Sequence, residues 1–222
     1  IIIFIIIVIN LIKNNSKEKF TDDKKKLKEF KNVWLDDKKG YNDAINLLKY
    51  FHNFCKKHNI NYFIHYGTLI GQKRHGGFIP WDDDIDVAAE KDSFEKIFNL
   101  LENDKIKILK YQNFYKLYYK NNESHHKYPW TWPFIDIFLY RINNDKIFIG
   151  DVGNTEHEYF KNDFLPTKEA KFEKTIINIP KNSIKFLNNF YKKWDEICIS
   201  SGWNHKYEHG LKEVTLPCKD VI

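Results

Sequence analysis

Four aspartates lie within five consecutive positions, Asp82, Asp83, Asp84 and Asp86, in the stretch HGGFIPWDDDIDVAAE at residues 75–90. In an extended segment, residues two apart point to the same face about 6.6–7 Å apart. Asp82, Asp84 and Asp86 would then share one face, and Asp83 would take the other. Because like charges repel at such separations, the group requires a positive partner. Hard divalent cations such as Mg²⁺ bind carboxylate oxygens, so the spacing indicates a metal site.

The alternative is that these aspartates form a solvated loop at the end of a sheet, since charge runs generally lie on protein surfaces. Here, however, the acids continue into an alternating run, DIDVAA at residues 84–89, which is typical of a strand with one buried face. An ionised carboxylate without a partner is unfavourable at such a position. The alternation therefore favours cation binding by Asp84 and Asp86.

A further acid, Asp136, stands among large apolar residues in PFIDIF at residues 133–138. A buried carboxylate at this position must be paired or coordinated, because an uncompensated buried charge is strongly destabilising. If its strand neighbours the strand of Asp84 and Asp86, three acids meet on one surface. The alternative is that Asp136 lies at the end of a sheet and faces water or a lysine.

Apolar periodicity predicts the elements that position these acids. Residues 41–60 are predicted to form a core-facing helix capped by Asn42 or Asp43. Its buried stripe would contain Ala44, Leu47, Leu48, Phe51, Phe54 and Cys55. A β-rich run at residues 61–66 ends at Gly67, and residues 67–76 are predicted as a helix opened by Gly67 and Thr68. The first amides of a helix lack partners and carry partial positive charge, so this junction suits phosphate.

Further elements are predicted downstream of the acids. A helix at residues 92–103 would have Asp92 as its cap and Glu95 in a capping box. A hairpin turning at residues 112–113, a strand at residues 133–141, an edge strand ended by Pro180 and an amphipathic helix at residues 182–197 would follow. The inward residues of that helix would be Ile184, Leu187, Phe190, Tyr191 and Trp194. Interleaved strands and helices predict an α/β or α+β fold with a mixed sheet flanked by helices.

Composition limits the class of protein. The 222 residues are 42% hydrophobic and 17% aromatic, enough for one domain with a substantial core. The net charge of +6 is spread along the chain, without the concentrated basic groove expected of a nucleic-acid-binding enzyme. Cys55, Cys198 and Cys218 form no CxxC pair, which argues against a zinc site and leaves one disulfide open.

The chain starts with an apolar run, IIIFIIIVINLI, at residues 1–12. The run is shorter than the roughly 20 residues that span a bilayer, and we predict it to be the end of a signal-anchor. A buried strand or a signal-peptide core are the alternatives. Residues 13–32 would form a polar stem and residues 33–222 the folded domain. The protein would then be membrane-associated and single-pass, with this domain in the secretory or Golgi lumen if eukaryotic or viral, and on the cytoplasmic face if bacterial.

The segment YGTLIGQKRHGGFIPWDDDIDV, residues 66–87, resembles the signature of the LicD family, which includes the fukutin-related proteins. PFIDIF resembles the family's third-acid strand, and INIPKNSIKFLNNFYKKW, residues 177–194, resembles its C-terminal strand, proline and helix. The resemblance covers residues 42–205 and implies a nucleotidyltransferase-type fold. Such a fold has a Gly-Thr or Gly-Ser helix start, an Asp-x-Asp pair and a third acid on a neighbouring strand.

The resemblance implies roles for the four acids. Asp84 and Asp86 would be the Asp-x-Asp metal ligands, and Asp136 would be the third acid, as a ligand or as the general base. Asp82 would orient a metal-bound water or cap the turn.

The resemblance also implies residues that bind the donor. Gly67 and Thr68 would bind the donor phosphate through backbone amides, and Lys73 and Arg74 lie where the family usually has a basic residue.

The family's activity implies a metal-dependent phosphotransferase. A CDP-linked alcohol would donate its phospho-alcohol, phosphocholine-like or related, to the hydroxyl of a glycan or glycoconjugate, with Mg²⁺ or Mn²⁺ as the cofactor. Two alternatives stay open. A DxD metal-dependent glycosyltransferase would hold the metal of a nucleotide-sugar without the Gly-Thr helix start. A non-catalytic glycan-binding or scaffold protein of the same fold would have lost an acid, whereas all three acids are present here.

Overall fold

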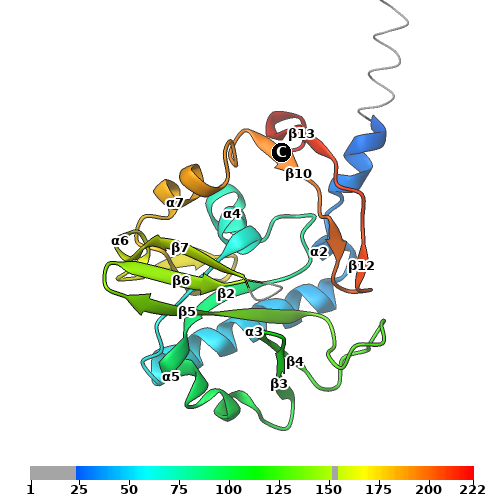
Figure 1. Cartoon of the computed structure of the whole chain (residues 1–222). Coiled ribbons are helices and arrows are strands. Elements are labelled where there is room, and N and C mark those ends of the chain that lie inside the picture. The colour runs from blue at the N-terminus through cyan, green and yellow to red at the C-terminus, as the bar shows by residue number, and fades with distance from the viewer. Residues whose placement is uncertain (1–23, 152–154) are drawn as a thin grey trace, which may run out of the picture.

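The computed structural model of the protein describes residues 24–151 and 155–222. Its centre is a seven-stranded mixed sheet in the order β1-β2-β5-β4-β3, to which β6 and β7 are added beside β5 (Figure 1). The strands of this sheet are β1 (Tyr62–Ile64), β2 (Asp86–Glu90), β3 (Ile106–Tyr111), β4 (Phe114–Tyr119), β5 (Phe134–Asn143), β6 (Lys146–Gly150) and β7 (Glu156–Phe160). Strands and helices interleave along the chain, which confirms the predicted fold class.

Strand β5 is the central strand around which the site is organised. It runs parallel to β2, with Asp136 opposite Asp86. On its other side it runs antiparallel to β4, with Asp136 opposite Lys116. The register therefore places a charged residue on each side of Asp136. The predicted hairpin is present as β3 and β4, joined at residues 112–113.

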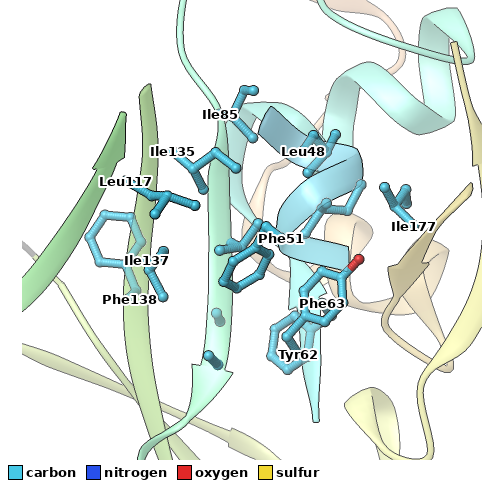
Figure 2. Packing of buried hydrophobic residues seen from close by; sticks show 14 of the residues in the cluster. Leu48, Phe51, Tyr62, Phe63, Ile85, Leu117, Ile135, Ile137, Phe138 and Ile177 are labelled. Carbon is cyan, nitrogen blue, oxygen red and sulfur yellow. The ribbon is translucent and has the colours of Figure 1, made fainter. Parts of the chain in front are cut away.

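Helices cover both faces of the sheet. They are α2 (Val33–Asp36), α3 (Lys38–Lys57), α4 (Tyr66–His75), α5 (Lys91–Glu95), α6 (Lys161–Phe164) and α7 (Ser183–Phe190). Tyr62 packs edge-on against Phe51 of α3, with ring centroids 5.0 Å apart, whereas its neighbour Phe63 contacts Phe164 of α6. Figure 2 shows Leu48 and Phe51 of α3 among the apolar residues of the strands. The predicted stripe of α3 is confirmed, because all six of its residues are buried.

Two predicted helix starts are wrong. Helix α3 begins at Lys38, and its cap is Asp37, whose side chain accepts a hydrogen bond from the Gly40 amide, rather than Asn42 or Asp43. Helix α5 spans residues 91–95 and is preceded by Glu90, so Asp92 lies inside its first turn and no capping box forms. The chain continues from α5 to a short 3₁₀ helix, η2 (Phe98–Leu101). The apolar stripe predicted for α3 is right, whereas the helix predicted at residues 92–103 is divided into α5 and η2. In both cases the conformation of the preceding chain decides which residue caps the helix.

The C-terminal helix is shorter than predicted. It ends at Phe190 instead of continuing to residue 197, and its buried residues include Phe186 and Leu187. Ile184 and Phe190 are exposed, contrary to the prediction, because the helix rests on α6 and α4 along a narrower stripe. The strand before it, β9 (Thr175–Ile179), pairs with β8 (Lys168–Phe172) in a separate two-stranded sheet and is not an edge of the main sheet.

The C-terminal segment, residues 197–222, forms two further small sheets. Strand β10 (Ile197–Ile199) pairs with β13 (Thr215–Pro217), and β11 (Trp203–Asn204) pairs with β12 (His209–Gly210). A disulfide joins Cys198 to Cys218 at the start of η4 (Cys218–Asp220). Figure 1 shows β10 and β13 beside the loop that follows α4. Trp81 of that loop donates its indole N–H to the carbonyl of Ile199 at 2.8 Å. The C-terminal segment is therefore attached directly to the loop that carries the acids.

The described part of the N-terminal region packs against the same loop. Residues Lys28–Phe30 form the 3₁₀ helix η1, and Phe30 is buried with its ring 4.9 Å from that of Trp81. The predicted polar stem, residues 13–32, thus contains a packed residue. The apolar run at residues 1–12 lies outside the described residues, so its assignment as a signal-anchor stays a prediction. Within residues 24–151 and 155–222, no helix combines the length and apolarity needed to cross a bilayer.

Candidate active site

Asp84, Asp86 and Asp136 form an acid cluster in which one carboxylate oxygen from each residue lies within 4.8 Å of the other two. Asp86 and Asp136 are opposite each other on the parallel strands β2 and β5, and Asp84 precedes β2. Side chains alternate along strands, so Asp86 and Asp136 occupy the same face of the sheet. The Asp136 amide donates to the carbonyl of Ile85 at 2.8 Å, which joins the two strands at the level of the acids.

Helix α4 begins beside the acid cluster. The amide of Asp86 donates to the Thr68 hydroxyl at 2.8 Å, so the first turn of α4 is hydrogen-bonded to the start of β2. Gly67 lies against Asp82, since a Cβ at position 67 would be 2.4 Å from Asp82 Oδ2. A side chain at position 67 would displace the Asp82 carboxylate, so glycine permits the close approach of α4 and the acidic loop, residues 76–85. The amino end of α4 consequently faces the acids, in the position where unpaired helix amides attract anions.

Burial and, after it, mutual repulsion between carboxylates dominate the electrostatics of the acid cluster. Burial, and then the carboxylates of Asp84, Asp136 and Asp82, raise the pKa of Asp86 well above its usual range. Burial and the neighbouring Asp84 raise the pKa of Asp82 in the same way. Burial also raises the pKa of Asp136, to about 6, although Lys116 opposes this effect. Carboxylates that destabilise one another in this way are stabilised by a cation placed among them.

The donor set fits a hard divalent ion. Opposite oxygens of a Mg²⁺ shell are about 4 Å apart when each bond is about 2.0–2.1 Å, and the 4.8 Å span of the acid cluster is close to that value. The three candidate ligands are all carboxylates, which suit Mg²⁺ or Mn²⁺ better than softer metals. Asp84, Asp86 and Asp136 are therefore the residues that would hold such an ion.

Lys116 forms a buried ion pair with Asp136. Its ammonium lies 2.7 Å and 2.9 Å from the two oxygens of Asp136, and both side chains are almost fully buried. The same ammonium lies 3.6 Å from the ring centroid of Phe134. Asp136 thus belongs to the acid cluster and also faces a lysine, so both sequence interpretations describe part of its environment. Sequence reasoning did not identify Lys116, although it is a lysine within the largely aromatic run FYKLYY of β4.

His205 adds a second cation that the sequence analysis did not identify. Its Nε2 lies 3.3 Å from Asp84 Oδ2, and its Nδ1 lies 2.9 Å from Asp83 Oδ1. Burial lowers the pKa of His205, but the carboxylates of Asp84, Asp83 and Asp82 outweigh this effect and raise the pKa to about 10. The ring is therefore protonated at neutral pH. Asp83 also accepts from the backbone amides of His205 and Lys206. Asp83 therefore attaches the C-terminal segment to the acidic loop.

The two basic residues predicted to bind donor phosphate lie apart. The Arg74 guanidinium donates to the carbonyl of Trp194 at 3.0 Å and lies over the ring of Trp81, within electrostatic range of Asp82. Lys73 instead lines a cavity with Lys168 and Lys181, beside the small β8–β9 sheet. The structure thus places Gly67, Thr68 and Arg74 around the acidic loop, whereas Lys73 lies apart from them, beside the β8–β9 sheet.

The sequence model of a known family matches this part of the chain. The family is described as LicD/FKTN/FKRP, nucleotidyltransferase domain, and the match extends over residues 59–182. This range is more than half of the chain and contains Asp84, Asp86 and Asp136, as well as Gly67 and Thr68. His205 and the rest of the C-terminal segment lie beyond it.

Three curated relatives each match part of the chain. The lipopolysaccharide cholinephosphotransferase LicD of Haemophilus influenzae is 48% identical over 57 residues, which is 26% of this chain and 22% of the relative. An uncharacterized protein of Rickettsia prowazekii is 28% identical over 157 residues, 69% of this chain and 55% of the relative. A second one, from Rickettsia typhi, is 30% identical over 155 residues, 69% and 47% respectively. The matches thus span about half the length, or less, of these curated relatives.

Among solved structures, the lincomycin-bound crystal structure of the lincosamide antibiotic adenylyltransferase LnuA aligns with a TM-score of 0.43 and 15% sequence identity. The alignment covers 79% of this chain and 92% of that chain.

Proposed function

The chain belongs to the LicD/FKTN/FKRP nucleotidyltransferase-domain family, and from this premise we propose that it is a metal-dependent phosphotransferase. The proposed reaction moves a phospho-alcohol, phosphocholine or a related group, from a CDP-linked donor to the hydroxyl of a glycan. The observation that carries the proposal is the acid cluster of Asp84, Asp86 and Asp136 beside the amino end of α4. The similarity to a lipopolysaccharide cholinephosphotransferase supports this choice of donor and acceptor class.

The acids and the helix start have separate tasks in this proposal. Asp84, Asp86 and Asp136 would hold Mg²⁺ or Mn²⁺, which would supply positive charge to neutralise the donor diphosphate and the transferred phosphoryl group. The amides at Gly67 and Thr68 bind the donor phosphate oxygens and orient the diphosphate. Arg74 lies near Asp82 and adds positive charge on this side.

The transfer itself needs positioning and one proton acceptor. The acceptor hydroxyl oxygen bonds to the phosphorus that carries the alcohol, the bond from that phosphorus to the CMP oxygen breaks, and CMP leaves. Asp136 takes the hydroxyl proton. Lys116 keeps Asp136 fixed through contacts to both carboxylate oxygens.

The compartment is proposed on separate grounds. Disulfides persist in oxidising environments and are rare in the cytosol. The Cys198–Cys218 disulfide therefore supports a catalytic domain on the lumenal or extracytoplasmic side of a membrane.

A screen of activated donors tests the proposal. Purified protein is incubated with CDP-choline, CDP-glycerol, CDP-ribitol or UDP-sugars, with Mg²⁺ or Mn²⁺ and a mixture of glycan acceptors, and nucleotide release is followed with EDTA as the control. We expect EDTA-sensitive CMP release, which Asp86→Asn abolishes and Asp92→Asn, at an exposed acid of α5, does not. EDTA-sensitive UDP release without CMP release would instead identify a glycosyltransferase, and no release from any donor would favour a non-catalytic protein.

A further inference from the structure

A cavity of about 430 Å³ adjoins the acidic loop on the side of the C-terminal segment. Two parts of the chain line it. Ile79, Trp81 and Asp82 come from the loop before β2, and the remaining lining residues are Ile199, Ser200, Ser201, Gly202, Trp203, His205 and Glu213. Its volume falls within the range of about 300–1,000 Å³ that is typical of ligand pockets. We call this feature the C-terminal cavity.

The C-terminal cavity adjoins the acid cluster through two of its lining residues, His205 and Asp82. His205 lines the cavity, and its Nε2 lies 3.3 Å from Asp84 Oδ2. Asp82 also lines it, and the carboxylate of Asp82 lies against Gly67 at the start of α4. A molecule bound in the cavity can therefore present a group to the reaction centre without crossing the sheet.

The lining chemistry selects against an anionic ligand. It contains the acids Asp82 and Glu213 but neither lysine nor arginine, and His205 already contacts Asp83 and Asp84. A diphosphate would find no lysine or arginine there to pair with, which disfavours its binding. The carboxylate of Glu213 instead offers hydrogen-bond acceptors to neutral hydroxyl groups.

Trp203 provides a fixed aromatic surface at this cavity. Its side chain is 41% exposed, yet its indole N–H donates to Glu208 at 2.9 Å. Its ring lies over Gly210, its partner across the β11–β12 pair, where an added Cβ would be 3.8 Å from the ring. An exposed ring that is already held in place binds a flat apolar surface, such as one face of a sugar ring, with little loss of side-chain entropy.

Glu213 is held close to the chain at Gly202. A Cβ at position 202 would lie 2.7 Å from Glu213 Oε1, so the carboxylate lies directly against the backbone at Gly202. Glu213 and Trp203 therefore both line the cavity, one as a hydrogen-bond acceptor and the other as an apolar platform.

We infer that the C-terminal cavity is the acceptor subsite and binds a neutral, hydroxyl-rich saccharide, which stacks on Trp203 and donates hydrogen bonds to Glu213. The inference rests on the proposed function, because it assigns the acceptor of that reaction to one part of the chain. It also implies that the C-terminal segment determines which acceptor binds. This segment lies beyond the family match at residues 59–182.

Ligand-detected NMR tests this assignment without requiring turnover. The full protein with Mg²⁺ is mixed with millimolar methyl glycosides of glucose, galactose and N-acetylglucosamine, and saturation transfer to each sugar is measured. We expect transfer to at least one glycoside, about tenfold weaker binding in Trp203→Ala, weaker binding in Glu213→Gln, and partial recovery in Trp203→Phe. Tyr207→Ala is the matched control, since Tyr207 is 50% exposed in the same segment but does not line the cavity. Its glycoside binding should equal that of the wild type.

CDP-choline binding, measured in the same samples, identifies the outcomes that overturn the inference. The subsite is refuted if no glycoside receives saturation, or if Trp203→Ala binds glycosides as the wild type does. Loss of CDP-choline binding in Trp203→Ala, with glycoside binding retained, would assign the cavity to the donor nucleotide instead. Failure of the proposed reaction has a different signature, namely glycoside binding that depends on Trp203 without CMP release from any CDP-linked donor.

Discussion

At the scale of single residues, Asp136 is the side chain whose role is most open to experiment. Its carboxylate is shared between the acid cluster and Lys116. If Asp136 is chiefly a metal ligand, Asp136→Asn should require much more Mg²⁺ or Mn²⁺ for half-maximal CMP release, and added metal should recover part of the rate. If it is chiefly the proton acceptor, metal dependence should barely change while the maximal rate falls by about 10²–10⁴. Near-normal rate and metal dependence would exclude both roles.

Lys116 permits a prediction about stability. Removing one partner of a buried ion pair leaves the other charge without compensation, which costs about 3–5 kcal/mol. Lys116→Met should therefore lower the free energy of unfolding by about that amount, measured by urea denaturation at pH 7. The double variant Lys116→Met/Asp136→Asn should regain much of the loss, because no unpaired charge remains. Equal stability of the single and double variants would show that the ion pair is not the cause.

At the scale of elements, the start of α4 depends on a histidine that is buried uncharged. His65 precedes α4, is fully buried, and has no hydrogen-bond partner for either ring nitrogen among the described residues. Burial lowers its pKa from 6.5 to about 3. The ring contacts Tyr66 and Phe186, and the attraction of the Asp151 carboxylate does not outweigh the effect of burial.

The sign of the resulting pH effect follows from proton binding. Below pH 6.5 the unfolded chain protonates residue 65, whereas the folded protein does so only near pH 3. Stability is therefore full above pH 6.5 and falls between pH 6.5 and 3, by up to about 1.4 kcal/mol per pH unit from this residue. His65→Phe, which keeps a ring and cannot titrate, should reduce the slope of unfolding free energy against pH between 6.5 and 4.5. An unchanged slope would mean that His65 is protonated in the folded state.

The disulfide links the ends of the C-terminal segment. Cys198 and Cys218 are 20 residues apart, and closing a loop of this length typically adds about 2–4 kcal/mol to stability. Cys198→Ala/Cys218→Ala should lower the free energy of unfolding of this segment by a comparable amount, and hydrogen exchange should increase first in β10 to β13. Cys55→Ala is a control for the loss of a buried thiol outside the segment. Uniform exchange in the double variant would show that the segment is held by its other contacts.

At the scale of the whole molecule, the acidic loop is supported from both ends of the described chain. Phe30 and the C-terminal Leu216 belong to one apolar cluster with Trp81, and the Val33 amide donates to the carbonyl of Pro80 at 2.8 Å. The structure thus moves the expected start of the packed domain from Val33 to a position before Phe30.

Two truncations should therefore behave differently. A protein starting at residue 24 keeps Phe30 and should retain the melting temperature and CMP release of the longer chain. A protein starting at residue 33 loses Phe30 and should be less stable by about 3 kcal/mol or more, the usual cost of removing a buried aromatic side chain. Phe30→Ala in the longer chain is the matched control. Aggregation of the protein that starts at residue 24 would show that the Ile-rich run belongs to the core.

The sequence by itself determined the features that depend on local geometry. The identities and spacing of Asp84 and Asp86, the apolar environment of Asp136 and the Gly-Thr start of a helix follow from periods of two and 3.6 residues, which are properties of the backbone. The stripe of α3, the β3–β4 hairpin and the fold class were predictable for the same reason. Helix ends were less predictable, because the capping residues depend on the conformation of the chain before each helix.

Only the tertiary structure decided which distant residues meet these elements. Lys116 faces Asp136 because β4 and β5 pair in one register out of several, and a shift by one residue would turn Lys116 to the opposite face. His205 reaches Asp83 across 122 positions of sequence, and the C-terminal cavity exists because the segment around it packs on Trp81. No local period encodes such contacts. These contacts form because the complete fold must bury apolar surface and give every buried charge a partner. Both requirements depend on all the packed elements together and not on any single segment.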